Sequence, residues 1–237
     1  MNISPTFIRL QRLIGFEAFN KLQNSKVLVF GVGGVGGYVC ESLARSGVGT
    51  IGIVDNDTVN LSNINRQIIA TTSTIDRYKT DVMEERILSI NPNCIVNKYT
   101  MFYLPETKDL IPLNEYDYIV DAIDTVTAKI ILIEEANRLN IPIICSMGTG
   151  NRMDPSKIIH TDLSKTSGDP LAKVMRRELR KRGITHLDVV TSTEAPIKPL
   201  SFEIGDERTP ASAPFVPPTA GLLIGSIVVQ SLIKYVK

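Results

Sequence analysis

The sequence predicts an α/β protein: a Rossmann-like, doubly wound and mostly parallel sheet, with an antiparallel extension and a C-terminal helix. Three observations predict this fold. Short apolar runs that suit buried strands alternate with helical segments through the first 150 residues. A glycine-rich turn follows the first apolar run and opens a helix. Two later runs end in acidic residues, where open sheets bind their ligands.

The predicted elements follow one another in a regular order. An amphipathic helical hairpin is expected over residues 7–22, where Arg9 and Arg12 lie one turn apart. Strands and helices then alternate, which favours parallel neighbours in one sheet. We expect strands at 26–30, 50–57, 94–102, 117–125 and 141–148, and helices from the glycine turn to about 45, at 77–90 and at 127–139.

The character of the chain changes after Gly150. Residues 156–163 and 186–195 resemble strands of an antiparallel extension, and a helix is expected between them at 169–183. Residues 196–218 hold six prolines and predict a loop or a mobile lid before a helix at 219–235. We therefore expect a single domain over 1–237, with a nucleotide-binding half at 1–150 and the extension, basic helix and proline-rich loop at 151–237.

The composition is that of an ordinary soluble protein, with 43% hydrophobic residues, 22% charged residues and a net charge of +1. This balance does not require a nucleic-acid partner, although a local patch can still bind one. The three cysteines show no C-x-x-C spacing, which argues against a disulfide framework and against zinc. We expect a cytoplasmic protein. The apolar run at 220–229 spans half a bilayer and predicts a buried helix rather than a membrane anchor.

The glycine turn predicts a nucleotide site. Glycines 31, 33, 34 and 36 let the backbone approach a phosphate chain, and the helix that follows offers free N–H groups. The alternative is that these glycines only pack helix against strand. Asp55 ends the second strand, 19 residues after Gly36, and suits an acid that binds ribose hydroxyls. On these features alone, an NAD-dependent dehydrogenase is the simple interpretation.

Polar residues beyond Asp55 favour a triphosphate over NAD. In the segment DNDTVNLSNINRQ, Asn63, Asn65 and Arg66 can reach phosphate oxygens, and a guanidinium binds these well. Lys79 begins the next helix and can neutralise phosphate charge, although an isolated lysine is more often a solvated surface residue.

Two carboxylates end the strand at 117–125. Asp121 and Asp124 stand at the carboxyl end of a central strand, where phosphates would repel them unless a cation intervened. This arrangement implies Mg²⁺, with Asp124 as its ligand. The alternative role for Asp124 is to cap the following helix.

The segment GVGGVGGYVCESLARSGVGTIGIVDNDTVNLSNINRQ resembles the ATP site of the ubiquitin-activating-type (ThiF/MoeB-like) adenylyltransferases, over about residues 7–150. The resemblance implies ATP and Mg²⁺ as cofactors, and a homodimer in which Arg12 of RLIG reaches the partner's active site. The implied catalytic residues are Arg12, Arg66, Lys79 and Asp124. The implied nucleotide-binding residues are Gly31, Gly33, Gly34, Gly36, Asp55, Asp57, Ser62, Asn63, Asn65, Arg66, Lys79, Asp124 and Thr125.

Within this superfamily, the second half resembles the tRNA threonylcarbamoyladenosine dehydratases. The similar pieces are RLIG, INPNC, DAIDTVTAK, TDLSKTSGDPLAKVMRRELRKRG and VVTSTEAP. Relatives that form thioesters or persulfides need a cysteine in this half, and the chain has none after Cys145. The resemblance implies ATP-dependent activation and cyclisation of the modification's carboxylate. It leaves open whether AMP or phosphate departs, and it includes a cysteine-desulfurase-type helper protein as a possible partner.

A basic helix at 171–183 favours an RNA partner. Six cations in this helix are offset by a single acid, Glu178, and phosphate backbones attract such clusters. The alternative is an ordinary solvated helix face. The candidate RNA contacts are Lys173, Arg176, Arg177, Arg180, Lys181 and Arg182.

Two other functions remain open from the sequence. The first is activation of the C-terminal glycine of a small sulfur-carrier protein, which requires a downstream thiol. The second is a non-catalytic NAD-binding module, which does not need Arg66, Lys79 or Asp124. His160 is interpreted as a strand residue, with a catalytic base as the alternative. Cys145 is expected to be buried and inert.

Overall fold

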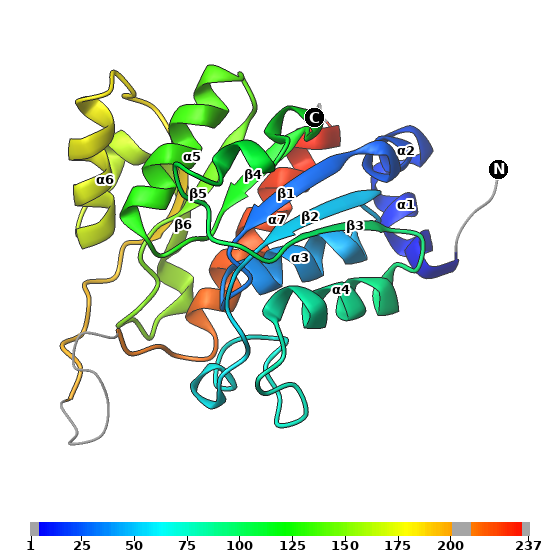
Figure 1. Ribbon diagram of the computed structural model, residues 1–237, viewed down its shortest axis with the longest axis horizontal. Helices are drawn as coiled ribbons and strands as arrows, with labels where there is room; N and C mark the ends of the chain where they lie inside the picture. Colours follow the sequence, from blue (N-terminus) through cyan, green and yellow to red (C-terminus); the bar gives the residue numbers. More distant parts are fainter. Residues whose placement is uncertain (1–4, 201–209, 234–237) are drawn as a thin grey trace.

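Seven strands form one sheet in the computed structural model, which describes residues 5–200 and 210–233 (Figure 1). The strand order is β3-β2-β1-β4-β5-β7-β6, and every neighbouring pair is parallel except β7 and β6. This is the predicted doubly wound sheet with its antiparallel extension. The strands are β1 (Lys26–Phe30), β2 (Thr50–Val54), β3 (Ile95–Tyr99), β4 (Tyr118–Asp121), β5 (Ile143–Ser146), β6 (Ile158–Asp162) and β7 (Asp188–Ser192).

Helices cover both faces of the sheet. On one face α3, α4 and α7 pack on the apolar side chains of the central strands, and on the other face α5 and α6 do so. The strands β2 and β4 are buried along their whole length, as parallel strands between two helical layers are. The helices are α1 (Ile8–Ile14), α2 (Phe16–Asn24), α3 (Gly36–Arg45), α4 (Lys79–Ile90), α5 (Val126–Arg138), α6 (Pro170–Arg180) and α7 (Val216–Ile233).

The register of the central strands brings their carboxyl ends together. Phe30 at the end of β1 pairs with Val54 of β2 on one side and with Asp121 of β4 on the other. The backbone N–H of Gly31 then donates to the carbonyl of Val54 at 2.8 Å, and that of Ala122 donates to Phe30 at 2.8 Å. The loops that follow these three strands therefore begin side by side, at the edge where open α/β sheets bind ligands.

The C-terminal helix begins earlier than the sequence predicts. We expected a proline-rich loop to residue 218, but α7 starts at Val216, and Pro217 and Pro218 lie in its first turn. The first turn tolerates proline because its N–H groups have no partner within the helix. Residues 201–209 of the expected loop lie outside the described part of the chain.

The helix α7 is long and apolar enough to cross a membrane by length and composition, with a mean hydropathy of 1.6. Half of it is nevertheless buried inside the protein. Its buried residues include Ala220, Ile224 and Val228, which pack in the core cluster beneath α3. A core helix therefore accounts for this composition.

A buried ion pair lies between β4 and α5. Lys129 and Asp121 are fully enclosed, and the Lys129 ammonium is 2.9 Å from the Asp121 carboxylate and 2.8 Å from the carbonyl oxygen of Ser146. The second carboxylate oxygen accepts from the N–H of Ile123 at 3.0 Å. Lys129 thus joins the ends of β4 and β5 and orders the loop that carries Asp124.

We expect Lys129→Met to destabilise the fold by about 3–5 kcal/mol, because it leaves the Asp121 carboxylate buried without a partner. Urea unfolding measures this loss. The matched control is Lys98→Met. Lys98 also contacts two carboxylates, but its side chain is 33% exposed, so its loss should cost less than about 1 kcal/mol. Equal losses in the two variants would contradict a structural role for the buried pair.

Candidate functional site

The glycine turn after β1 is built by close backbone contacts. Gly31 has φ +85°, and a methyl group there would lie 2.6 Å from the carbonyl oxygen of Ala122. A methyl group at Gly36 would lie 1.7 Å from the carbonyl oxygen of Gly31. Only glycine is compatible with both positions. The turn therefore closes tightly and leads directly into α3. The N–H groups of Gly37 and Tyr38 donate to carbonyls of the turn, so Gly36 supplies the first-turn N–H that has no backbone acceptor among the described residues.

Asp55 connects the end of β2 to the glycine turn. One carboxylate oxygen accepts from the N–H of Val32 at 2.7 Å, and the other accepts from the N–H of Asp57 at 2.9 Å. Burial raises the pKa of Asp55, while the nearby Lys79 ammonium opposes this shift. The carboxylate thus fixes the glycine turn from the position where an acid would bind a ribose.

Lys79 is the first residue of α4 and is almost enclosed, with a side chain only 7% exposed. Its ammonium lies 2.7 Å from the Asp57 carboxylate and 3.9 Å from that of Asp55. The sequence alternative of a solvated surface lysine is therefore wrong. This cation is held beside the glycine turn by two acids.

The segment between β2 and α4 forms a rim over the glycine turn. Asn60 and Asn63 cap each other across a short 3-10 helix, Leu61–Asn63. The Arg66 guanidinium donates to the carbonyl of Ser62 at 3.0 Å and to the side chain of Asn65 at 2.8 Å. The side chains of Asn63 and Asn65, which we expected to face phosphate, thus bond to protein groups here.

Arg66 and the start of α7 enclose Gly34 from two sides. A methyl group at Gly34 would lie 3.3 Å from Cγ of Arg66 and 3.2 Å from Cβ of Pro217. The C-terminal helix therefore reaches the glycine turn, a contact that sequence analysis did not predict. Gln67 was also missed. It is buried near Gly33, and its side-chain oxygen has no partner in the described part of the chain.

Asp124 and Thr125 lie exposed in the loop before α5. The helix cap is Thr125, not Asp124, and it makes no side-chain capping bond. The hydroxyl of Thr125 donates to the Asp124 carboxylate at 3.2 Å, which leaves that carboxylate otherwise open to solvent. Within residues 5–200 and 210–233, no three His, Cys, Asp or Glu side chains gather as a metal cluster.

Arg12 lies apart from the other candidates within one chain. It is exposed on α1, which together with α2 precedes β1 and lies near the amino end of that strand (Figure 1). Asp55, Arg66 and Lys79 gather at the carboxyl end instead. The fold brings together the candidates from the glycine turn to Asp124 and leaves Arg12 and the basic helix outside this group.

Comparison with known proteins agrees with this geometry. The model of the ThiF family matches residues 8–237. The chain belongs to the ThiF family. A Bacillus subtilis (strain 168) protein named tRNA threonylcarbamoyladenosine dehydratase is 44% identical over 96% of this chain and 94% of its own length. The Escherichia coli (strain K12) protein of the same name is 39% identical over 80% of this chain and 74% of its own length.

Solved ThiF-type structures share the complete fold. The crystal structure of the E. coli tRNA N6-threonylcarbamoyladenosine dehydratase, TcdA, in complex with ATP superimposes with a TM-score of 0.90 at 34% sequence identity. The match covers 99% of this chain and 98% of that chain. The resemblance noted from the sequence therefore extends through the antiparallel extension and α7 of this ThiF-family chain.

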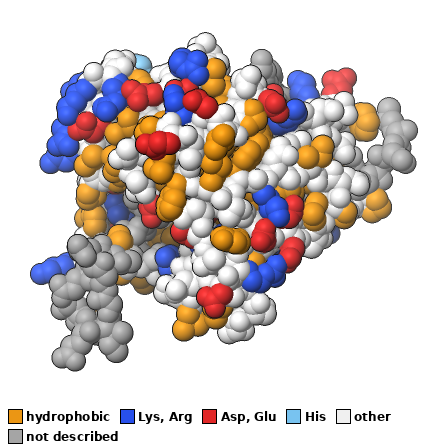
Figure 2. Space-filling view, in the orientation of Figure 1, with side chains coloured by type: hydrophobic (Ala, Val, Ile, Leu, Met, Phe, Trp, Pro, Cys, Tyr) orange, Lys and Arg blue, Asp and Glu red, His pale blue; other side chains and the backbone are white. Residues whose placement is uncertain are grey.

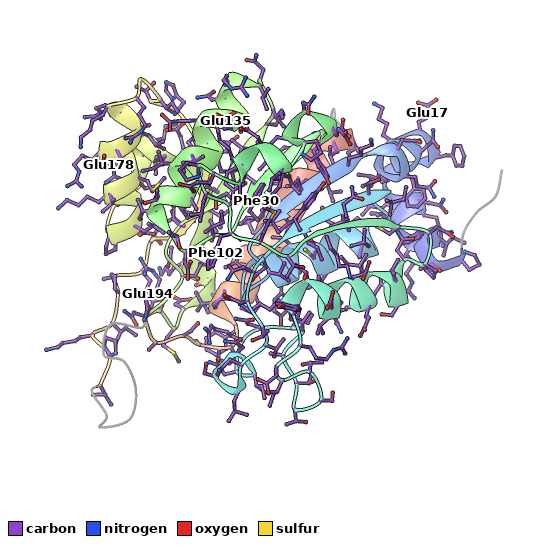
Figure 3. The ribbon with its side chains drawn as sticks, viewed as in Figure 1. Glu17, Phe30, Phe102, Glu135, Glu178 and Glu194 are labelled. Carbon is purple, nitrogen blue, oxygen red and sulfur yellow. The ribbon has the colours of Figure 1, made fainter. Side chains whose placement is uncertain are left out.

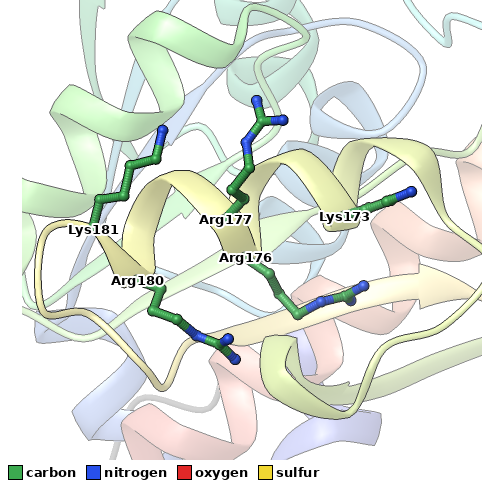
Figure 4. A pocket seen from close by; sticks show the side chains of 5 residues that line it. All are labelled: Lys173, Arg176, Arg177, Arg180 and Lys181. Atoms are coloured by element: carbon green, nitrogen blue, oxygen red, sulfur yellow. The ribbon is translucent and has the colours of Figure 1, made fainter.

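Four of the six predicted RNA-contact residues of this ThiF-family chain lie on α6, and Lys181 and Arg182 follow its end. Figure 2 shows Lys and Arg side chains gathered over this helix, and Figure 4 shows Arg177 and Lys181 projecting on one side, with Arg176 and Arg180 on the other. Five of the six cations line one surface pocket, namely Lys173, Arg176, Arg177, Arg180 and Lys181.

The contacts of these cations differ. Arg176 donates to the backbone and hydroxyl of Thr166, and so holds the turn before α6. Arg177 and Lys181 pair with Glu178, and Arg182 pairs with Glu134 at 3.3 Å.

His160 and Cys145 lie where the sequence interpretation placed them. His160 is exposed on the edge strand β6 and lies 3.2 Å from the Asp188 carboxylate. Cys145 is fully buried in β5, and this burial raises its pKa well above the usual value. All three cysteines are buried and free, as expected of inert packing residues.

The Asp55–Lys79 contact predicts a pH dependence of stability. Because the folded-state pKa of Asp55 is raised, this group contributes stability that is fully present below its unfolded-state pKa and is lost as pH rises through the folded-state pKa. Lys79→Met removes the cation that lowers this pKa, so the loss should continue to higher pH. Urea unfolding between about pH 4 and pH 8 measures the profile.

The matched control is the double variant Asp55→Asn/Lys79→Met, whose stability should no longer change over the range in which Asp55 titrates. A single variant Lys79→Met with the same pH profile as the unaltered protein would show that the two groups are not coupled.

Proposed function

We propose that this protein is an ATP-dependent tRNA threonylcarbamoyladenosine dehydratase, which activates the carboxylate of that modification and cyclises it. The observation that carries the proposal is the gathering of Asp55, Arg66 and Lys79 around the glycine turn, in a ThiF-family chain. Support comes from relatives of this name that are similar over almost the whole chain.

ATP is the nucleotide that this arrangement favours. Asp55 suits the ribose, and the glycine turn with the first turn of α3 suits phosphates. Arg66 at the rim and Lys79 beneath it supply two cations close to the turn. A triphosphate carries more negative charge than the pyrophosphate of NAD, so these cations favour ATP over a dinucleotide.

The donor set near Asp124 fits Mg²⁺. This ion keeps several waters and is commonly held by one or two carboxylates together with substrate phosphates, so a single open carboxylate is sufficient protein ligation. When bound, Mg²⁺ would neutralise charge on the phosphates. The proposed ligand is Asp124, held at the end of β4 by the Asp121–Lys129 pair.

The proposed chemistry has two steps. A carboxylate oxygen of the threonylcarbamoyl group attacks the α-phosphorus of ATP, the bond from the α-phosphorus to the bridging oxygen breaks and pyrophosphate leaves, so that an acyl-adenylate (a mixed anhydride) forms. A neighbouring atom of the same modification then loses its proton, attacks the acyl carbon, closes a ring and expels AMP, which carries away the carboxylate oxygen. Arg66 and Lys79 stabilise the phosphate charge. Proximity makes the ring closure fast without a protein nucleophile, which agrees with the buried, inert Cys145.

We further propose a homodimer in which Arg12 acts on the partner's site. An apolar groove between α1 and α7 supports this, because it is lined by Leu13, Ile14, Leu222 and Val229. Leu13 is 72% exposed and Leu222 is 49% exposed, so both would be covered by a second chain. We also propose that the protein acts in the cytoplasm and that a cysteine-desulfurase-type helper protein works with it.

The dehydration assay tests the proposed function. The pure protein is incubated with ATP, Mg²⁺ and tRNA from cells that lack this gene. The tRNA is then digested, and the masses of its nucleosides are measured. We expect the threonylcarbamoyladenosine mass to fall by one water. Asp124→Ala should lower the rate about 100-fold or more, because charge on the phosphates is no longer neutralised.

Asp109→Ala is the matched control, since it removes an exposed carboxylate from the short 3-10 helix Lys108–Leu110, and it should leave the rate unchanged. An unchanged nucleoside mass would contradict the proposal if ATP–pyrophosphate exchange appeared only with a Gly-Gly-tailed carrier protein. That result would identify the sulfur-carrier activity instead.

The contacts of α6 predict which cations bind tRNA. Lys173 and Arg180 are exposed and have no ion pair among the described residues, whereas Arg176 is engaged with Thr166. The variant Lys173→Gln/Arg180→Gln should weaken tRNA binding and reduce the slope of log affinity against log salt by about 1 for each phosphate that the variant no longer neutralises.

Filter binding at several salt concentrations checks this prediction. The matched control is Arg45→Gln, which removes an exposed cation from α3 and should leave the salt slope unchanged. Equal slopes in the unaltered protein and the α6 variant would show that the basic helix is a plain solvated face.

A further inference from the structure

Arg152 is a buried cation without a counter-ion in the described part of the chain. It is only 3% exposed, and one terminal nitrogen, Nη1, donates to the carbonyl of Gly150 at 3.1 Å. Its Nε and Nη2 are buried and have no hydrogen-bond partner among residues 5–200 and 210–233. Among the described residues, the two other buried cations, Lys79 and Lys129, each contact a carboxylate. Arg152 therefore differs from them in lacking an anion.

The two unpaired nitrogens lie on one edge of the guanidinium. Nε–H and Nη2–H point the same way and form the fork that binds both oxygens of a carboxylate. A guanidinium stays protonated at any physiological pH, so burial cannot be relieved by loss of its proton. Burying a charged guanidinium with unpaired N–H donors costs free energy, unless an anion accepts hydrogen bonds from those donors.

A carboxylate near this loop is already committed elsewhere. Glu194 accepts from the N–H of Met153 at 3.0 Å and from that of Asp154 at 2.9 Å, and Figure 3 shows it beside this loop. These bonds fix the backbone immediately after Arg152. The acid orders the loop but leaves the guanidinium fork unpaired.

The loop of Arg152 adjoins the rim of the nucleotide site. Asn151 exchanges hydrogen bonds with Ala211, through its own N–H at 2.7 Å and its side-chain oxygen at 2.7 Å. The next residue, Ser212, accepts from the side chain of Asn65 at 2.9 Å, and Asn65 in turn accepts from Arg66. Arg152 thus follows β5 at the same edge of the sheet as the glycine turn, one residue from a segment bonded to the rim.

We propose that Arg152 binds the carboxylate of the substrate, with Nε and Nη2 each donating to one oxygen. This proposal rests on the proposed function and names the residue that recognises the reacting group. Arg66 and Lys79 lie at the glycine turn, where the phosphates of ATP are proposed to bind. The guanidinium of Arg152 lies apart from them and is therefore free to bind the other anion of the reaction, the substrate carboxylate. Because both nitrogens are enclosed, the anion can reach them only when the two hydrogen bonds that join Asn151 to Ala211 open.

The test compares Arg152→Gln and Arg152→Lys with the unaltered protein in three measurements. These are affinity for ATP, affinity for tRNA with and without the threonylcarbamoyl group, and the rate of dehydration. We expect the unaltered protein to prefer the modified tRNA. Arg152→Gln should lose this preference, lower the rate roughly 10- to 100-fold and leave ATP affinity unchanged. Arg152→Lys should restore part of the preference, since it keeps the charge without the fork.

Stability separates a binding role from a structural one. Arg152→Met removes a buried, unpaired charge and should raise Tm in the absence of ligands while activity is lost. A lower Tm would overturn the proposal by showing that the charge is satisfied in the free protein. Arg138→Gln, which removes an exposed arginine from α5, is the matched control and should alter none of these measurements.

The remaining outcomes show whether the anion bound by Arg152 is the substrate carboxylate or a nucleotide phosphate. Weaker ATP binding by Arg152→Gln, with the tRNA preference kept, would assign the fork to a nucleotide phosphate and overturn the carboxylate proposal. Full activity of Arg152→Gln would overturn the proposed role of Arg152 and leave the proposed function of the protein standing. An inactive unaltered protein would overturn the proposed function itself, and with it the substrate named for this fork.

Discussion

The candidate site depends on the close approach of the backbone after β1 to the backbone after β4. The register of these parallel strands places Gly31 against Ala122, at a distance that excludes any side chain. The same edge receives Asp55 from β2 and Asp124 from the loop after β4. One sheet register therefore decides where the glycine turn, the proposed ribose-binding acid and the proposed Mg²⁺ ligand stand relative to one another.

Near this edge of the sheet, the buried cations differ in whether a carboxylate accompanies them. Lys79 and Lys129 are enclosed and each is matched by a carboxylate, so both can order backbone without an unpaired charge. Lys129 does so directly beneath the loop of Asp124. Arg152 is enclosed to the same degree but unmatched among the described residues. Because the other buried cations of the described residues are paired, the proposed partner of this guanidinium is an anion that arrives with a substrate.

The outer surface has a basic face at α6 and an apolar groove at α7. On α6 and directly after it, Arg176 and Arg182 bond to protein groups, whereas Lys173 and Arg180 face solvent. Along α7, one side packs in the core and the other meets the exposed apolar residues of α1 in a groove. A basic face suits a polyanion and an apolar groove suits a protein surface, so the two helices support different partners.

The sequence by itself determined the order of strands and helices, the glycine turn and most of the residues that gather around it. These follow from local periodicity and from the need for glycine where backbones touch. Only the tertiary structure decided that Pro217 reaches Gly34, that Lys79 is enclosed by two acids and that Arg152 is buried without a partner. These facts depend on contacts between segments far apart in the chain, and local patterns carry no information about which distant group will face a given side chain.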